Sequence, residues 1–293
     1  MTLKTVPASI AALLAASVLL AGCNDDSSGD ADGEKSGDPT TSASTGASDG
    51  ASAGTSDDAS EDGGSSGDGS GELTTDNFFD EVLEAQQAAG SFKGRATTTT
   101  AGTSMTIETE ATYEDGKALS HGRTTADSPQ KLETISASGV VYIQAAGLGV
   151  PAGKWLKIDS NDPANKDNPF AALAAISDPE TALRAMGDLD SLKLVGAEKV
   201  DGVDADHYKA VMNTKSYADV LGLPADAAST LPKTIPFDIW IDDENRPVKY
   251  DVSLSTQGVT TSTSQTYYDY GSDVDITVPK DGDTVSLSET GLG

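Results

Sequence analysis

The chain has 293 residues, with 47 acidic and 19 basic side chains, so its formal net charge is −28 at pH 7. Such a chain repels the phosphate backbone of nucleic acids and anionic membrane surfaces, and no basic patch in the sequence offsets this charge. A single cysteine, Cys23, excludes an internal disulfide, and with only two histidines it leaves no ligand set for a structural zinc ion.

The first 22 residues are organised like a bacterial export signal. Lys4 and the N-terminal amine supply positive charge, and residues 10–21 are apolar but too short to span a bilayer. The segment ends in Leu-Leu-Ala-Gly-Cys at positions 19–23, which resembles the lipobox of bacterial lipoproteins. The resemblance implies that residues 1–22 are a signal peptide that is removed, and that the Cys23 thiol receives a diacylglyceryl group.

A lipid on Cys23 would anchor the protein outside the cytoplasm. Each buried CH₂ contributes roughly 0.8 kcal/mol, so two palmitate-type chains bind a membrane durably and no transmembrane helix is needed. The alternative is an ordinary secreted protein with a chance cysteine. A lone cysteine without a disulfide partner favours the anchored reading.

Residues 24–72 have the composition of a tether. Ser, Gly, Asp, Thr and Ala dominate, there is no aromatic residue, and 13 acidic side chains stand against one base, Lys35. A segment of this kind cannot bury a core, and its charge favours a disordered, extended chain. It would span roughly 40 Å as a flexible coil. We therefore expect residues 23–72 to be a lipidated, acidic linker between the membrane and a folded domain at residues 73–293.

Most of residues 73–293 follow the two-residue period of β-strands. Apolar and polar side chains alternate at residues 104–113, 235–242 and 248–255, which predicts half-buried antiparallel strands. Further strands are predicted at residues 92–100, 131–138, 140–144, 155–158, 193–200, 206–212 and 259–268. Turn residues at 114–117, 138–139, 201–202 and 242–246 separate several of them. The pattern predicts a sheet of about ten strands, linked mainly by hairpins.

Three stretches have helical spacing instead. Residues 73–89 predict an amphipathic helix behind a Thr75 or Asp76 cap. Residues 169–186 predict two short helices, because Pro179 follows Asp178 and suits a first helical position. Residues 216–229 form the third stretch. Each has an apolar stripe to place on one face of a curved sheet, so the predicted fold class is α+β.

Three motifs carry a family resemblance. They read Asp-Gly-Val-Asp-Ala-Asp-His-Tyr at 201–208, Pro-Phe-Asp-Ile-Trp-Ile-Asp at 236–242 before Pro247, and Tyr-Asp-Tyr-Gly-Ser-Asp-Val-Asp-Ile at 268–276 before Pro279. Their order behind a lipobox and tether resembles the LppX/LprAFG family of actinobacterial lipoproteins. The resemblance implies a curved antiparallel sheet, or half-open barrel like that of periplasmic lipoprotein carriers, with helices covering its concave face. It also implies a hydrophobic cavity that binds or transfers lipids or glycolipids at the cell envelope.

Apolar residues of the second helical stretch, together with Trp240, are the candidates for lining that cavity. Small alanines between the larger side chains of residues 170–176 would leave space for an alkyl chain. The candidate lining residues are Phe170, Leu173, Ile176, Leu183, Met186 and Trp240. Trp240 also suits a site beneath a covering helix, and the whole set also suits a closed core. A closed core would favour a second function, a cell-surface interaction or sensor lipoprotein with a protein partner.

Catalytic and metal-binding patterns are weak. His121 stands in a turn-like Ser-His-Gly, His207 stands in a predicted strand, and the sequence has no Gly-x-Ser-x-Gly motif around a nucleophile. Acidic residues at 201–206 and 159–167 contain calcium-type ligands without the twelve-residue loop pattern, so turn formation explains them better. We therefore expect neither an enzyme nor a cofactor or metal site.

Overall fold

The computed structural model describes residues 72–114, 117–128, 130–146, 148–160, 162, 183–184, 186, 189–215, 229, 231–256 and 258–290. The predictions for the signal peptide, Cys23 and the tether lie outside the described residues. So do most of the two later helical stretches, including Phe170, Leu173 and Ile176.

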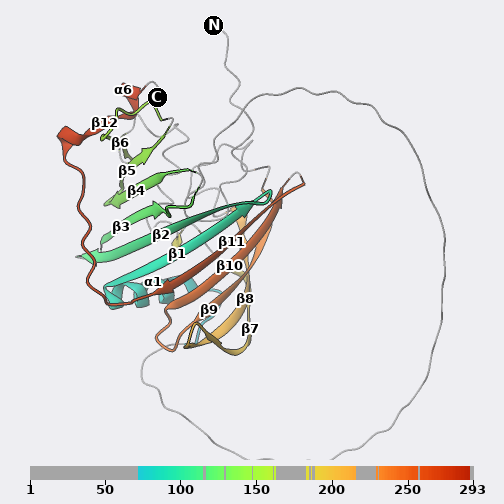
Figure 1. The fold of residues 1–293 in the computed structure, drawn as a ribbon. Helices are drawn as coiled ribbons and strands as arrows, with labels where there is room; N and C mark the ends of the chain where they lie inside the picture. The colour runs from blue at the N-terminus through green and yellow to red at the C-terminus, as the bar shows by residue number, and fades with distance from the viewer. Residues whose placement is uncertain are drawn as a thin grey trace, which may run out of the picture. The chain divides into compact units, whose positions relative to one another are not determined.

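The described part of the chain forms a 12-stranded sheet with the order β12-β6-β5-β4-β3-β2-β1-β11-β10-β9-β8-β7 (Figure 1). The strands are β1 (Ser91–Thr100), β2 (Thr103–Glu114), β3 (Lys117–Thr124), β4 (Leu132–Ala137), β5 (Val140–Ala145), β6 (Trp155–Asp159), β7 (Leu189–Val200), β8 (Val203–Asn213), β9 (Thr234–Ile241), β10 (Pro247–Thr256), β11 (Val259–Tyr268) and β12 (Thr284–Ser286). Every neighbouring pair is antiparallel except β12 and β6, which are parallel. The sheet is curved (Figure 1). It is also unclosed, because β12 and β7 form its two edges.

One face of this sheet carries the main hydrophobic core. The alternation of the strands turns Ile107 of β2, Ile143 of β5 and Ile239 of β9 to the same cluster of buried side chains. Leu156 and Ile158 of β6 are fully buried in it. Because each buried aliphatic side chain contributes roughly 1.5–3 kcal/mol, this face determines which way every strand is turned.

Helix α1 (Phe78–Ala89) opens the described domain and packs on that core. Phe78, Val82 and Leu83 are buried at helical spacing, and Gln86 continues the same face. The helix ends at Ala89, and the capping residue Gly90 has a φ of 77°, a conformation that glycine adopts without strain. Its N-cap is Asn77, so the predicted cap was wrong by one or two residues. The predicted helix itself is confirmed.

Two strands of the sheet were not predicted. β3 contains little beyond Leu119 to suggest a buried strand, and it forms because its backbone pairs with β2 on one side and β4 on the other. His121 therefore lies within a strand, and its assignment to a turn was wrong. β12 has three residues and depends on the parallel pairing with β6. Neither strand has a local signal as strong as that of β9 or β10.

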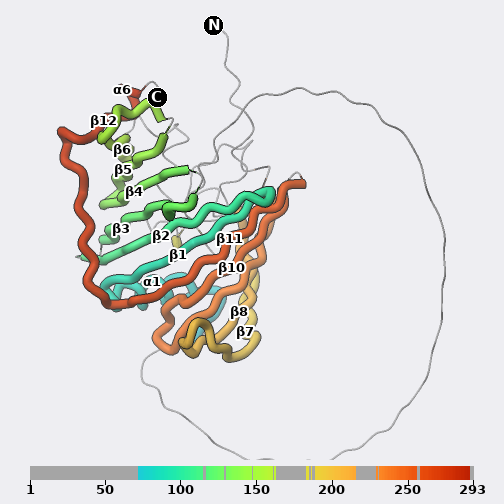
Figure 2. The backbone as a smooth tube through the Cα atoms, in the orientation of Figure 1, coloured from blue at the N-terminus to red at the C-terminus, as the bar shows by residue number. Residues whose placement is uncertain are grey.

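The last part of the chain crosses the sheet from the middle to one edge. After β11, residues 269–280 pass the ends of β1 to β6 before the 3₁₀ turn Asp281–Asp283 and β12, as the tube in Figure 2 shows. Gly271 N–H donates to the Ser91 carbonyl at 2.9 Å, and the Tyr270 hydroxyl donates to the Pro247 carbonyl at 2.7 Å. A short helix, α6 (Leu287–Thr290), ends the described chain with Leu287 buried in the main core.

Among the described residues, no helix has the length and apolar character needed to cross a membrane.

Candidate functional site

The apolar face of the sheet is the first candidate region. Of the predicted lining residues that the structure describes, Leu183 and Met186 are partly buried and pack against the main core. The structure thus brings these two side chains to the face that also holds Phe78, Ile107 and Ile143. Their role in lining a cavity remains a prediction, since Phe170, Leu173 and Ile176 lie outside the described residues.

Trp240 is not brought to that face. It belongs to a separate cluster with Ala205 and Val248, because it points from β9 in the opposite direction to Ile239 and Ile241. Only 8% of Trp240 is exposed, and its ring stacks on His207 with the centroids 4.3 Å apart. The structure therefore separates Trp240 from Leu183 and Met186.

His207 is held between two carboxylates beside Trp240. Its Nδ1 lies 3.0 Å from Glu198 Oε1 and its Nε2 lies 2.6 Å from Asp238 Oδ1. Both ring nitrogens of His207 therefore have a carboxylate as hydrogen-bond partner. With both ring nitrogens engaged, His207 has the contacts of a structural residue rather than a general base.

Glu198 joins the histidine to the tryptophan. Trp240 Nε1–H donates to Glu198 Oε2 at 3.0 Å, and this bond, with the one from His207, holds the pKa of Glu198 below its usual range. Lys249 lies over the Trp240 ring, with Nζ 4.5 Å from the centroid. Glu198, His207, Trp240 and Lys249 lie on the face of the sheet opposite the main core, and we call them the outer-face cluster. Their hydrogen bonds and ring contacts connect β7, β8, β9 and β10.

The Trp240 contact should show a characteristic pH dependence. Because the folded pKa of Glu198 is depressed, its stabilising effect is present above about pH 4.5 and is lost as the pH falls through the folded value. In a Trp155→Phe variant Trp240 is the only tryptophan, since the chain has two. We expect its fluorescence to change in this acid range, and the change to vanish when Glu198→Gln is added. An unaltered titration in the double variant would contradict this assignment.

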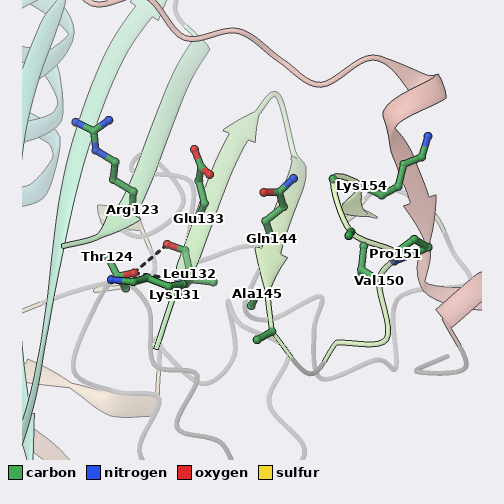
Figure 3. Close-up of a pocket in the computed structure, with 13 residues that line it drawn as sticks. Arg123, Thr124, Lys131, Leu132, Glu133, Gln144, Ala145, Val150, Pro151 and Lys154 are labelled. Atoms are coloured by element: carbon green, nitrogen blue, oxygen red, sulfur yellow. Dashed lines mark hydrogen bonds between the residues drawn. The ribbon is translucent and has the colours of Figure 1, made fainter. Parts of the chain in front are cut away.

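A hollow of about 530 Å³ at the rim of the sheet is the second candidate region (Figure 3). It lies where β3 and β5 end and where β4 and β6 begin, and we call it the rim pocket. Its lining combines cations, apolar residues and other polar groups: Arg123, Lys131, Lys154, Leu132, Ala145, Ala146, Val150, Pro151, Ala152, Gly153, Thr124, Glu133 and Gln144. In Figure 3 the Arg123, Glu133, Gln144 and Lys154 side chains extend to the same side of the strands.

The cations of the rim pocket are held to different degrees. Lys131 Nζ donates to the Thr125 and Ala126 carbonyls at 2.9 and 2.6 Å, and Lys154 Nζ donates to the Gly282 carbonyl. Arg123 Nε lies 3.9 Å from Glu108, a carboxylate that Arg95 already binds at 2.6 Å. Of these three cations, Arg123 thus has the longest contact to a partner group.

The sequence did not indicate this pocket. Arg123, Lys131 and Lys154 are widely spaced in a domain with 34 acidic and 17 basic residues, so composition predicted no basic patch. The pairing of β3 with β4 and of β5 with β6 brings them together. Because β3 was missed, no pattern in the sequence could have placed Arg123 beside the other two.

Metal binding has no support among the described residues. The one group of three neighbouring ligands there is Asp242, Asp243 and Glu244, whose oxygens lie within 4.8 Å of one another. Asp242 forms an ion pair with Arg246, whose Nε–H donates to Asp242 Oδ2 at 2.9 Å. The group is therefore a hairpin turn with its own counter-charge.

No protein-family model and no curated protein matches the sequence. Among solved structures, LprF from Mycobacterium bovis matches with a TM-score of 0.42 and 13% identity, over 70% of this chain and 96% of that chain. The Mycobacterium tuberculosis lipoprotein LppX matches with a TM-score of 0.41 and 14% identity, over 68% of this chain and 96% of that chain. The Pseudomonas aeruginosa MucA/MucB complex matches with a TM-score of 0.36 and 17% identity, over 66% of this chain and 56% of that chain.

LprF and LppX, which bear the names of the family that the three motifs resemble, are both among the structural matches. At these TM-scores and identities the matches assign no ligand or activity to this chain.

Proposed function

We propose that the protein is an extracytoplasmic lipoprotein, anchored through Cys23, that binds lipids or glycolipids against the apolar face of its curved sheet. The observation that carries this proposal is the position of Leu132. Leu132 belongs to the main core and also lines the rim pocket, where Ala145 and Val150 pack against the same core. The apolar face of the sheet therefore extends as far as Leu132 and Ala145 at its rim, and the sheet does not close on itself, which supports access for an alkyl chain from that side. An alkyl chain entering there would gain roughly 25 cal/mol per Å² of buried apolar surface.

The anchor and the tether extend the proposal from binding to transfer. The lipobox-like ending at Cys23 supports attachment to the outer side of the cell membrane, and the acidic segment 24–72 supports reach away from it. A bound lipid could then be carried between the membrane and the surrounding envelope. Replacing the thiol in Cys23→Ser should move the protein from the membrane fraction to the soluble fraction, and a variant that stays membrane-bound would contradict the anchor.

Lipid loading of the full-length Cys23→Ser chain tests the function. Native mass spectrometry after incubation with a lipid extract should show protein–lipid complexes. Ala145→Trp, which adds a large ring to the apolar face beside Leu132, should reduce loading severalfold. Ala137→Trp is the matched control, since it adds the same ring at the other end of the β4–β5 hairpin and should leave loading unchanged. A folded protein that never carries lipid would refute the carrier function.

A protein-binding function is the second candidate, and the β7–β8 hairpin favours it. β7 is an edge strand, and Leu194 and Val195 on it are 53% and 48% exposed, while Val203 on β8 is 43% exposed. Edge strands with exposed apolar side chains can pair with a strand of another protein. The loading experiment separates the two functions, because a protein-binding module with a closed core would remain free of lipid.

A further inference from the structure

We infer that the β7 edge of the sheet is the surface with which the protein docks on a lipid bilayer, so that a lipid can pass there between the membrane and the apolar face. This inference rests on the proposed lipid-binding function and adds to it the place where the protein meets its source of lipid. It does not involve the rim pocket, because β7 and β12 form opposite edges of the sheet (Figure 1).

The exposed apolar side chains of β7 are the first observation. Leu194 and Val195 are 53% and 48% exposed, the two largest values among the large apolar side chains of the described residues. In the described sheet β7 pairs with β8 alone, so its other side is an open edge. We call Leu194, Val195 and the partly buried Leu192 and Tyr208 the edge patch. Exposed apolar patches typically mark sites that bind a membrane or a protein.

Leu194 lies on the apolar face of the sheet. It pairs with Tyr208 of β8, which in turn pairs with Ile239 of β9, and paired residues of antiparallel strands point to the same face. Ile239 is buried in the main core, and Leu192 and Tyr208 pack against that core. The ring of Tyr208 also lies 6.3 Å from that of Phe78. The edge patch is therefore continuous, on one face of the sheet, with the buried apolar interior.

A bulge in β7 favours a bilayer over a strand of another protein. The pairing of β7 with β8 shifts between Leu194 and Gly196, so Val195 has no partner residue on β8. A bulge on an edge strand bends the strand and hinders its pairing with a further strand. Apolar side chains can enter the acyl layer of a bilayer without any backbone pairing. The bulge therefore leaves Leu194 and Val195 suited to lipid and poorly placed for a strand partner.

The local charge and the position of the tether are compatible with this docking. The domain has 34 acidic and 17 basic residues, and most of its surface would be repelled by an anionic membrane, but β7 has no net charge. Burial raises the pKa of the Tyr208 hydroxyl, and the nearby charges of Asp206 and Glu72 raise it further. Glu72, the first described residue, thus lies near Tyr208. The acidic segment 24–72 therefore joins the domain beside the edge patch, so the patch can face the anchored membrane.

A single fluorescent label tests the docking surface. The full-length Cys23→Ser chain contains no cysteine, so Val195→Cys in that background carries one nitrobenzoxadiazole label. With dioleoylphosphatidylcholine vesicles its emission should rise severalfold and move to shorter wavelength, because the label leaves water for the acyl layer. The matched control is Val259→Cys at the start of β11, which replaces a residue that is 47% exposed and should not respond.

A charge variant tests the same surface without a label. Leu194→Glu/Val195→Glu should lower the vesicle partition coefficient about tenfold in flotation experiments, since carboxylates are costly to place in the acyl layer. Val259→Glu/Tyr268→Glu adds the same charge at exposed apolar sites on β11 and should float like the parent chain. Leu194→Ser/Val195→Ser should also lower flotation, and it serves if the glutamate variant does not fold.

The outcomes distinguish docking from lipid loading and from a protein partner. Equal label responses at positions 195 and 259, or a response at neither, would overturn docking at the β7 edge, and lipid loading by native mass spectrometry would still decide the carrier function. Docking through position 195 by a protein that never carries lipid would support the edge patch and refute the carrier function. A label at position 195 that responds to envelope proteins and not to vesicles would overturn the inference in favour of a protein-binding edge.

Discussion

Phe78→Ala is expected to lower the free energy of unfolding by about 3–5 kcal/mol, the cost of removing a large aromatic side chain from a well-packed core. Phe78 is completely buried at the start of α1 and contacts the ring of Phe79 edge-on, with the centroids 5.2 Å apart. Its ring also lies 6.3 Å from that of Tyr208 on β8. α1 contacts β1 as well, so the cavity left by the substitution would separate the helix from two distant parts of the sheet.

Urea denaturation of the full-length protein measures this effect. Glu84→Ala, on the exposed side of the same helix, is the control and should change the free energy of unfolding by less than about 0.5 kcal/mol. If Phe78→Ala were as mild as Glu84→Ala, α1 would not be part of the cooperative core. A loss of lipid loading in Phe78→Ala at temperatures where it remains folded would further connect α1 with the apolar face.

The predicted strands were right where one side of the strand is buried. In β9 and β10 the alternation of Ile235, Phe237 and Ile239, and of Tyr250, Val252 and Leu254, matches the buried face in the structure. The hydrophobic effect acts on every second residue of such a strand, so the sequence records it. β3 is different because its buried residues include Ala118, Ser120 and Gly122, and small or polar side chains leave no clear period.

The candidate site was less predictable than the sheet. Leu183 and Met186 were recognisable as apolar residues at helical spacing, and they do pack on the core. For Trp240 the same alternation that identified β9 could have separated it from Ile239 and Ile241, but an aromatic residue suits either face of a strand. The rim pocket depends on strand pairing across three hairpins, which is long-range information that no local pattern contains.

The three family-like motifs have structural roles that explain their composition. Asp201 and Gly202 form the β7–β8 turn with φ of 49° and 93°, a conformation that favours these residue types. His207 and Trp240, from the first and second motifs, stack on the outer face. Tyr270, from the third motif, fastens the chain after β11 to Pro247. The motifs therefore contribute to the architecture of the sheet.

Asp242→Ala is expected to destabilise the protein by about 3 kcal/mol, because it removes one partner of a largely buried ion pair and leaves backbone donors without an acceptor. Asp242 is 6% exposed at the end of β9. Its Oδ1 accepts the N–H groups of Glu244 and Arg246 at 3.1 and 2.8 Å, and its Oδ2 accepts the Arg246 guanidinium at 2.9 and 2.8 Å. One carboxylate thus fixes both the turn and the arginine that lies over the ring of Tyr270.

Thermal and urea denaturation of a short variant series would separate these contributions. Asp242→Asn keeps an oxygen for the turn N–H groups and loses the charge, so it should fall between wild type and Asp242→Ala. In an Arg246→Ala background the cost of Asp242→Ala should shrink, since no uncompensated guanidinium remains beneath the hairpin. If Asp242→Ala cost the same with and without Arg246, the ion pair would contribute nothing and the turn hydrogen bonds alone would account for the stability of the β9–β10 hairpin.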